Sequence, residues 1–350
     1  MRLSSMPQNF RECLALACGM APTPLMDTLV GLLLAKTIIA ATTIGIFDAL
    51  ETEPLTAAEI AEKCGSEAKA TEKLVRALFA CKYLKCEGNR FKLAPVSRRW
   101  LPRKAFRSLH WAILHRSLDL RFMNFEEYVR HGKSQDFHSA LSQEEWRIYH
   151  QGQANHAAQI MDEVIERMPL PTNATDLLDL GGGHGLYSVA FCKRYPNLNA
   201  RVLDLATAIG EVEAKRAADS AYSRVQFEVG DIRTVSLRPH STDVILLANV
   251  VHHFDRPTNR SLMQRVALAL RSSGIVIVID AFRPASLRQT GQLEGLLDLY
   301  FGAASGVGLW TLEEIREWSR KAGLDPLPPR TLRRMPICRM QVARKAEQGQ

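Results

Sequence analysis

The sequence has 350 residues, of which 46% are hydrophobic and 23% are charged. This composition can bury one large core and a second, smaller one, so it excludes a largely disordered chain. The formal net charge is +8, but the basic excess is spread over both halves, with one dense basic stretch at 330–345. Because nucleic-acid-binding proteins more often concentrate positive charge on one element, we expect no nucleic-acid partner.

Seven cysteines form an odd set without a C-x-x-C pair, which predicts neither a disulfide framework nor a thiolate zinc site. We therefore expect no metal and a cytoplasmic location. The apolar segment 29–47 is long enough to span a bilayer, but it carries Lys36, whose charge is costly in lipid. We expect a helix buried in a protein interface and no membrane span.

Residues 55–100 predict two short helices followed by a β-hairpin. Thr56 stands at an N-cap with Glu59 three residues later, and a second helix is expected within 66–84. A tight turn at 87–89 then joins two short strands, which completes a winged-helix pattern. A DNA-binding version would place its second helix in the major groove, but the distributed charge favours a structural unit buried in a dimer.

Residues 105–170 are expected to be mostly helical, and prolines end the long amphipathic run at 144–168. Short apolar strands then alternate with helix-like segments, as in a parallel sheet covered on both faces. The predicted strands are 175–180, 200–205, 225–229, 243–248 and 274–280. We expect an α/β protein with a mostly α-helical, winged-helix-like domain at 1–104, a helical linker and substrate-pocket region at 105–170, and a doubly wound domain at 171–350.

A glycine cluster follows the first predicted strand, in the run Asp179-Leu180-Gly181-Gly182-Gly183-His184-Gly185. Glycines at this place let the backbone pass close to a ligand. Leu186 stands where a dinucleotide fingerprint needs its last glycine or alanine, and the Lys-Ser/Thr pair of a phosphate-binding loop is missing. A carboxylate beside the loop, at Asp179, suits an ammonium or sulfonium ligand and would repel a pyrophosphate.

Two further carboxylates follow the next predicted strands. Asp204 could accept both hydroxyls of a ribose, and Asp231 could bond the exocyclic amine of adenine. A single strand-end aspartate is more typical of a helix cap. Three of them in this order after the glycine loop predict a site for a sulfonium nucleoside.

These motifs resemble the class I S-adenosylmethionine-dependent methyltransferases, and more narrowly the dimeric small-molecule O-methyltransferases that include the caffeate and flavonoid enzymes. The resemblance covers the chain from about Leu29 and rests on TAAEIAEKCG (56–65), DLLDLGGGHG (176–185), RVLDL (201–205), VGDI (229–232) and VVHHFD (250–255). It implies a Rossmann-like methyltransferase domain, an N-terminal dimerisation domain, and a homodimer whose subunits close each other's substrate pockets. The cofactor would be S-adenosyl-L-methionine, bound by Asp179, Gly181, Gly183, Gly185, Asp204, Leu205, Asp231, Ile232 and Phe254.

Methyl transfer from a sulfonium needs alignment and a deprotonated acceptor, and a histidine at a strand end can take the acceptor proton. The family commonly has His-Asp-Trp where this chain has His252-His253-Phe254. Adjacent side chains point in different directions, so we expect only one of the two histidines to be catalytic. The resemblance aligns His252 with the family's general base, so we favour His252 over His253, with Asp280 orienting it. The alternative is that both histidines merely cap the next helix.

The acceptor is expected to be a hydroxylated aromatic small molecule from secondary metabolism. The long helix and a later segment offer as substrate contacts Tyr149, Gln153, His156, Tyr300 and Phe301. The last two are equally typical of a core. Gln153 replaces a methionine common in the family, which indicates a more polar acceptor or one positioned by a hydrogen bond. Leu309 stands where plant members have a second orienting glutamate, which weakens the case for strong base catalysis.

Three other functions compete with O-methylation. In a C- or N-methyltransferase of the same fold, the weakened orienting shell around the general base would matter less, because the acceptor atom can already be nucleophilic. A winged-helix transcription regulator with a ligand-sensing methyltransferase-like domain would be expected to lose the glycine loop or the strand-end acids, and both are present. A nicotinamide oxidoreductase is disfavoured by the glycine spacing.

Overall fold

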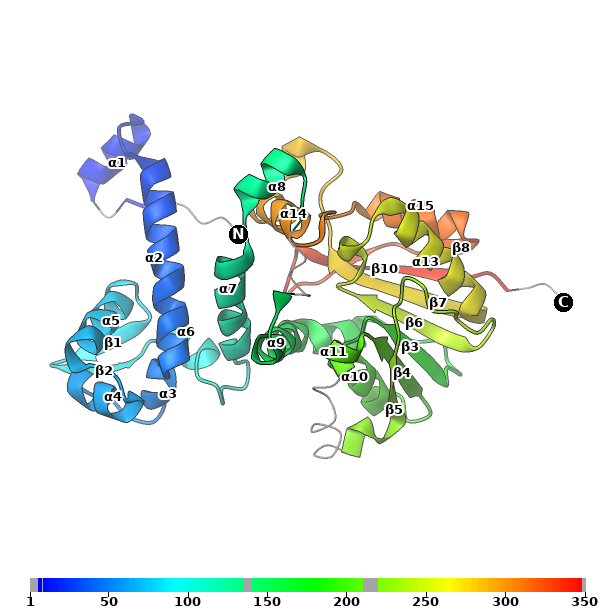
Figure 1. The fold of residues 1–350 in the computed structure, drawn as a ribbon, viewed down its shortest axis with the longest axis horizontal. Coiled ribbons are helices and arrows are strands. Elements are labelled where there is room, and N and C mark those ends of the chain that lie inside the picture. Colours follow the sequence, from blue (N-terminus) through cyan, green and yellow to red (C-terminus); the bar gives the residue numbers. More distant parts are fainter. Residues whose placement is uncertain (1–5, 8, 135–139, 210–219, 348–350) are drawn as a thin grey trace. The chain divides into compact units, whose positions relative to one another are not determined.

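The computed structural model describes residues 6–7, 9–134, 140–209 and 220–347, and its chain divides into two compact units, Met1–Leu120 and Arg121–Gln350 (Figure 1). The first unit is helical with one small sheet. Its elements are α1 (Phe10–Ala17), α2 (Thr23–Ile44), α3 (Ile46–Ala49), α4 (Ala57–Cys64), α5 (Ala68–Ala80), β1 (Leu84–Glu87), β2 (Arg90–Leu93), α6 (Pro95–Trp100) and most of α7 (His110–Phe122).

The winged-helix pattern is confirmed in the first unit. Helix α4 begins with a capping box, in which the Glu59 N–H donates to Thr56 Oγ1 and the Thr56 N–H donates to the Glu59 carboxylate at 2.7 Å. Strands β1 and β2 pair antiparallel with Leu84 opposite Leu93, as expected for the wing. Helices α3, α4 and α5 pack with the hairpin around one core that includes Ile60 and Leu78.

Helix α2 is apolar and largely exposed in this chain. Leu25, Leu29 and Leu33 recur every four residues and are 50–59% exposed. By length and composition it is a candidate membrane span, which is weak evidence because helices of soluble proteins pass the same test. An apolar stripe of this size costs free energy while it faces water, so it needs a covering surface.

The second unit is built on an eight-stranded sheet with the order β5-β4-β3-β6-β7-β10-β8, and β9 pairs with β10. Its elements are α8 (Phe125–His131), α9 (Gln143–Arg167), β3 (Asp176–Leu180), α10 (Leu186–Arg194), β4 (Asn199–Asp204), α11 (Ala206–Ile209), η2 (Ser220–Arg224), β5 (Val225–Val229), β6 (Thr242–Ala248), η3 (Val251–His253), α13 (Arg256–Ala269), β7 (Leu270–Ala281), η4 (Leu287–Gln289), α14 (Gln292–Ser305), α15 (Leu312–Lys321), β8 (Leu324–Pro326), β9 (Arg330–Thr331) and β10 (Cys338–Lys345).

The five predicted strands are confirmed as β3 to β7, and they pair in parallel. The purely parallel sheet was too simple a prediction, because β10 inserts antiparallel between β7 and β8. The dense basic stretch at 330–345 is therefore largely sheet: Met340 and Val342 are buried, while Arg339 and Arg344 are exposed. The predicted helical stretch between β4 and β5 includes 210–219, which lie outside the described residues.

Alternate residues of the central strands point to opposite faces of the sheet, where they belong to two separate hydrophobic cores. On one face Leu177 and Leu246 pack with residues of α9 and α10. On the other face Leu178 and Leu247 pack with residues of α13 and α15. This layering leaves the carboxyl ends of β3, β4, β5 and β6 at one edge of the sheet, where the strand order reverses beside β3.

Candidate active site

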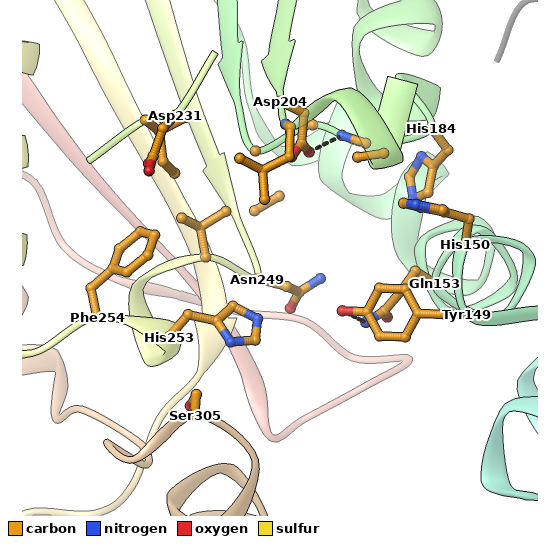
Figure 2. A pocket seen from close by; sticks show the side chains of 18 of the residues that line it. Tyr149, His150, Gln153, His184, Asp204, Asp231, Asn249, His253, Phe254 and Ser305 are labelled. Atoms are coloured by element: carbon orange, nitrogen blue, oxygen red, sulfur yellow. Dashed lines mark hydrogen bonds between the residues drawn. The ribbon is translucent and has the colours of Figure 1, made fainter. Parts of the chain in front are cut away.

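A cavity of about 630 Å³ lies at this edge, within the second unit. Figure 2 shows side chains from the strand ends facing side chains of α9 across it. The predicted site residues that line it are Tyr149, Gln153, Gly181, Gly183, Asp204, Leu205, Asp231, Ile232 and Phe254. Those outside its lining are Asp179, Gly185, His252, Asp280, His156, Tyr300 and Phe301.

Side chains at Gly181, Gly182 and Gly185 would clash with residues packed around the glycine loop. A Cβ on Gly181 would lie 2.7 Å from Val250, and one on Gly182 would lie 2.5 Å from the Asp179 carboxyl carbon. Gly181 and Gly185 also have positive φ angles, 74° and 66°, which L-residues adopt at a cost. The loop therefore leaves its backbone bare toward the cavity, as a closely held ligand requires.

Asp179 lies beneath this loop instead of on the cavity wall. Its side chain is fully buried, and Ser188 Oγ donates to its Oδ2 at 2.8 Å. Burial raises the pKa of Asp179 to about 7, and the neighbouring Asp204 charge adds to the rise while the Ser188 bond opposes it. The Asp179 carboxyl therefore packs against the underside of the loop at Gly182 and is tied to α10 through Ser188.

Asp204 and Asp231 line the cavity as expected. Asp204 accepts the Gly183 N–H at 2.8 Å and the Leu205 N–H at 2.7 Å, which fixes its carboxylate at the end of β4. Burial raises its pKa, and the two N–H bonds limit that rise. Asp231 is paired with Arg233 at 2.6 Å, a partner that the sequence analysis did not identify, and hydrogen bonding to that arginine lowers the pKa of Asp231.

The two histidines occupy different places. His252 Nδ1 and Asp280 Oδ1 lie 2.7 Å apart, as the sequence analysis expected, and both side chains are almost fully buried. The Phe301 ring lies over the His252 ring, with centroids 3.9 Å apart. His253 instead lines the cavity, and its ring centroid is 4.2 Å from that of His252.

Three side chains that the sequence analysis did not single out hold the histidine turn. Asn259 Nδ2 donates to the carbonyls of Val251 and Phe254 at 2.9 and 2.8 Å, which ties the two ends of the turn together. Trp310 Nε1 donates to the Val251 carbonyl, and Ser305 Oγ donates to the His252 carbonyl. The backbone of the turn is thereby fixed without using either imidazole.

One face of α9 forms the opposite wall of the cavity. Trp146, Tyr149, His150 and Gln153 follow the i, i+3, i+4, i+7 spacing of a single helix face, and all four line the cavity. That spacing could have identified Trp146 and His150 from the sequence. His156 lies beyond this stretch and does not line the cavity.

Tyr300 and Phe301 are both partly buried on α14, where they pack edge to face at a centroid distance of 5.0 Å. Phe301 packs against the core under β7, and neither ring lines the cavity. β10, which the sequence analysis missed, brings Cys338 close to the base of the site. Burial and the nearby Asp280 charge raise the pKa of the Cys338 thiol to about 12.

Residues 108–324, more than half of the chain, match the O-methyltransferase domain family. The chain belongs to this family. The O-methyltransferase dimerisation domain matches residues 26–103, which include the winged unit. The predicted family, fold and cofactor are thus confirmed: the chain is an S-adenosylmethionine-dependent methyltransferase. The glycine loop and the fixed carboxylate of Asp204 fit that cofactor. The loop exposes backbone without side chains at one edge of the cavity, and the two carboxylate oxygens of Asp204 can accept hydrogen bonds from the ribose hydroxyls.

Named relatives differ in the atom that they methylate. Acetylserotonin O-methyltransferase of Bos taurus is 26% identical over 275 residues, 72% of this chain and 77% of that protein. The N,N-dimethyltransferase OxyT of Streptomyces rimosus is 24% identical over 262 residues, 70% of this chain and 74% of that protein. The crystal structure of human N-acetylserotonin methyltransferase in complex with SAM has the same fold, with a TM-score of 0.82 and 19% identity over 99% of this chain and 100% of that chain.

The raised pKa of Asp179 predicts a pH-dependent stability. The folded state holds this proton up to about pH 7, whereas an unfolded aspartate releases it near pH 4, so the stabilising effect is complete below about pH 4 and is lost by about pH 7. The loss is at most about 1.4 kcal/mol per pH unit within that window. Asp179→Asn should remove it, so the variant gains unfolding free energy relative to the wild type between pH 5 and pH 8.

Urea unfolding at both pH values measures this difference, and exposed Asp325 gives the matched control, Asp325→Asn. The control should follow the wild type. Parallel pH dependences for Asp179→Asn and the wild type would contradict the assignment of a buried, protonated Asp179.

Proposed function

We propose that this enzyme transfers a methyl group to a hydroxyl of an aromatic small molecule, a secondary metabolite. The observation that carries the proposal is that one cavity joins the glycine loop and Asp204 to a wall of aromatic and neutral polar side chains on α9. Such a wall suits a flat, partly polar ring.

The cofactor, when bound, supplies a methyl group already activated on a sulfonium. The protein must then bind the acceptor in line, exclude water and remove the hydroxyl proton. We propose His252 as the group that takes this proton, at Nε2; because its ring lies under Phe301 and outside the cavity lining, the acceptor hydroxyl must displace the Phe301 ring to reach it. The bond from Nδ1 to Asp280 favours the tautomer with the hydrogen on Nδ1, and the buried carboxylate stabilises the imidazolium that forms.

Methylation of carbon or nitrogen is the second candidate. Leu309 occupies the place of a second orienting carboxylate; it is 3% exposed and packs in the core. A ring carbon or an amine that is already nucleophilic needs less help from a base, so this site would still serve it. The relative OxyT is named an N,N-dimethyltransferase, which supports methylation of nitrogen.

We further propose a cytoplasmic homodimer that buries the exposed stripe of α2 between two copies. Leu29 and Leu33 of the stripe lie within the part of the chain that the dimerisation domain matches. All seven cysteines are free thiols, which fits a reducing compartment. Each subunit would also help to close the substrate pocket of the other.

The proposed base predicts the effect of His252→Ala. Removing a general base lowers kcat/KM by about 10²- to 10⁴-fold, and Asp280→Asn should lower it by less, because the imidazole remains but loses its partner. Turnover of a phenolic acceptor with labelled donor measures both effects, while affinity for S-adenosylhomocysteine should stay unchanged. Exposed His240 provides the control His240→Ala. Retention of most activity in His252→Ala would contradict the base and favour the second candidate.

The proposed dimer predicts that charges on the exposed stripe separate the subunits. The double substitution Leu29→Glu and Leu33→Glu places two carboxylates in the interface, where each is costly to bury. Light scattering should then give the mass of one chain instead of two. The control Lys63→Glu changes a charge on α4 of the same unit and should leave the dimer intact. A wild-type monomer, or a dimer that survives the double substitution, would contradict the proposal.

A further inference from the structure

The turn that follows β5 presents Asp231, Ile232 and Arg233 to the cavity. Within this turn, the N–H groups of Thr234 and Val235 donate to the Asp231 carbonyl at 3.0 and 2.8 Å. The Arg233 N–H donates to the Asp231 carboxylate at 2.8 Å. Asp231 therefore caps its own turn with its side chain, so the direction of its carboxylate follows the position of the turn.

The carbonyl groups of the same turn are held by Arg265, which lies on α13 and is partly buried. Arg265 Nη2 donates to the carbonyls of Ile232 and Arg233 at 2.8 and 2.9 Å. Arg265 Nη1 donates to the Val235 carbonyl at 2.7 Å. The planar fork of a guanidinium suits several acceptors at once, and its positive charge suits the negative ends of peptide dipoles. Arg265 thereby ties the turn to α13.

Helix α13 is a firm support, because its Leu262 and Val266 are at most 1% exposed in the core under the sheet. The same helix carries Asn259, whose amide donates to two carbonyls of the histidine turn. Two side chains of one buried helix thus hold two neighbouring turns of the cavity, the one after β5 and the one after β6. The separation of these turns is set by the helix.

The charges near the turn keep Asp231 ionised. Hydrogen bonding to Arg233 is the main cause that lowers the pKa of Asp231, and the charge of Arg265 lowers it further. An ionised carboxylate accepts hydrogen bonds and donates none. At this place a ligand amino group would therefore be bound, whereas a ligand carbonyl oxygen would be repelled.

We propose that Arg265 is a positioning residue for the cofactor, which acts through the turn at 231–235 to hold the Asp231 carboxylate against the amino group of adenine. This inference rests on the proposed placement of the nucleoside at the edge formed by the glycine loop and Asp204. Loss of Arg265 releases the turn and with it the recognition of the amino group. The remainder of the nucleoside keeps its contacts with the glycine loop and Asp204.

The test compares two ligands of the full chain by calorimetry. They are S-adenosylhomocysteine and S-inosylhomocysteine, in which an oxygen replaces the amino group of the base. The wild type should bind the adenine compound at least about tenfold more tightly, because a charge-assisted hydrogen bond is exchanged for a contact between two acceptors. Arg265→Met should reduce this ratio to about threefold or less, mainly by weakening the adenine compound. Arg265→Lys keeps the charge without the fork, so its ratio should lie between these values.

Two further variants connect the ratio to the proposed contact. Arg260→Met is the matched control, because Arg260 lies on the same helix but pairs with Glu317 of α15, and this variant should keep the wild-type ratio. Asp231→Ala removes the carboxylate itself. The double variant Arg265→Met and Asp231→Ala should show the ratio of Asp231→Ala alone, because both changes act on one contact. A general loss of structure would instead weaken both ligands alike and leave the ratio unchanged.

Three results would overturn the inference: a wild type that binds both ligands equally, a folded Arg265→Met variant with the wild-type ratio, or additive effects in the double variant. Urea unfolding reports whether each variant is folded, and Arg265→Lys decides by the same criterion if Arg265→Met is not. Labelled methyl transfer to a phenol tests the proposed function separately. An unchanged ratio with transfer would remove the role of Arg265 alone, whereas a lost ratio in a series without transfer would remove O-methylation alone.

Discussion

The turn from β3 into α10 passes over a buried carboxylate, and Gly181, Gly182 and Gly185 in this turn have no space for a side chain. A Cβ on Gly182 would collide with Asp179, and one on Gly185 would lie 2.8 Å from the Phe227 ring. This packing exposes the loop backbone at the edge of the sheet and orients the Gly183 N–H toward Asp204. The edge of the cavity where we propose the cofactor binds depends on this contact, because a displaced loop would lose both the bare backbone and the fixed carboxylate.

The remainder of the site is positioned by the layers around the sheet. Strands β6 and β7 are neighbours, so the histidine turn after one and Asp280 near the end of the other come together, and the buried His252–Asp280 bond joins them. Asn259, at the start of α13, holds this turn by donating a hydrogen bond to the Val251 carbonyl. Helix α9 packs against α10 on one face of the sheet and presents its Tyr149 side to the cavity. Each wall thus comes from an element that a hydrophobic core holds in place.

Local patterns made much of this structure predictable. The capping box at Thr56, the apolar strands and the glycine loop are short-range features, and parallel strands bring their ends to one edge by topology alone. The placement of β10 was not predictable in this way, because its antiparallel pairing with β7 joins segments distant in sequence and its basic residues obscure its buried positions. Tertiary packing also decided that Phe301 covers His252 while His253 lines the cavity, which adjacency in the sequence cannot distinguish.

We propose that the glycine loop and Asp204 together bind the sulfonium nucleoside. Calorimetry of S-adenosylhomocysteine against wild type and Asp204→Ala, with NAD titrated in parallel, tests it most directly. We expect one site per chain in the wild type, at least tenfold weaker binding in the variant through loss of charge-assisted hydrogen bonds, and no comparable binding of NAD. Equal affinity of the variant, or tighter binding of NAD, would contradict it.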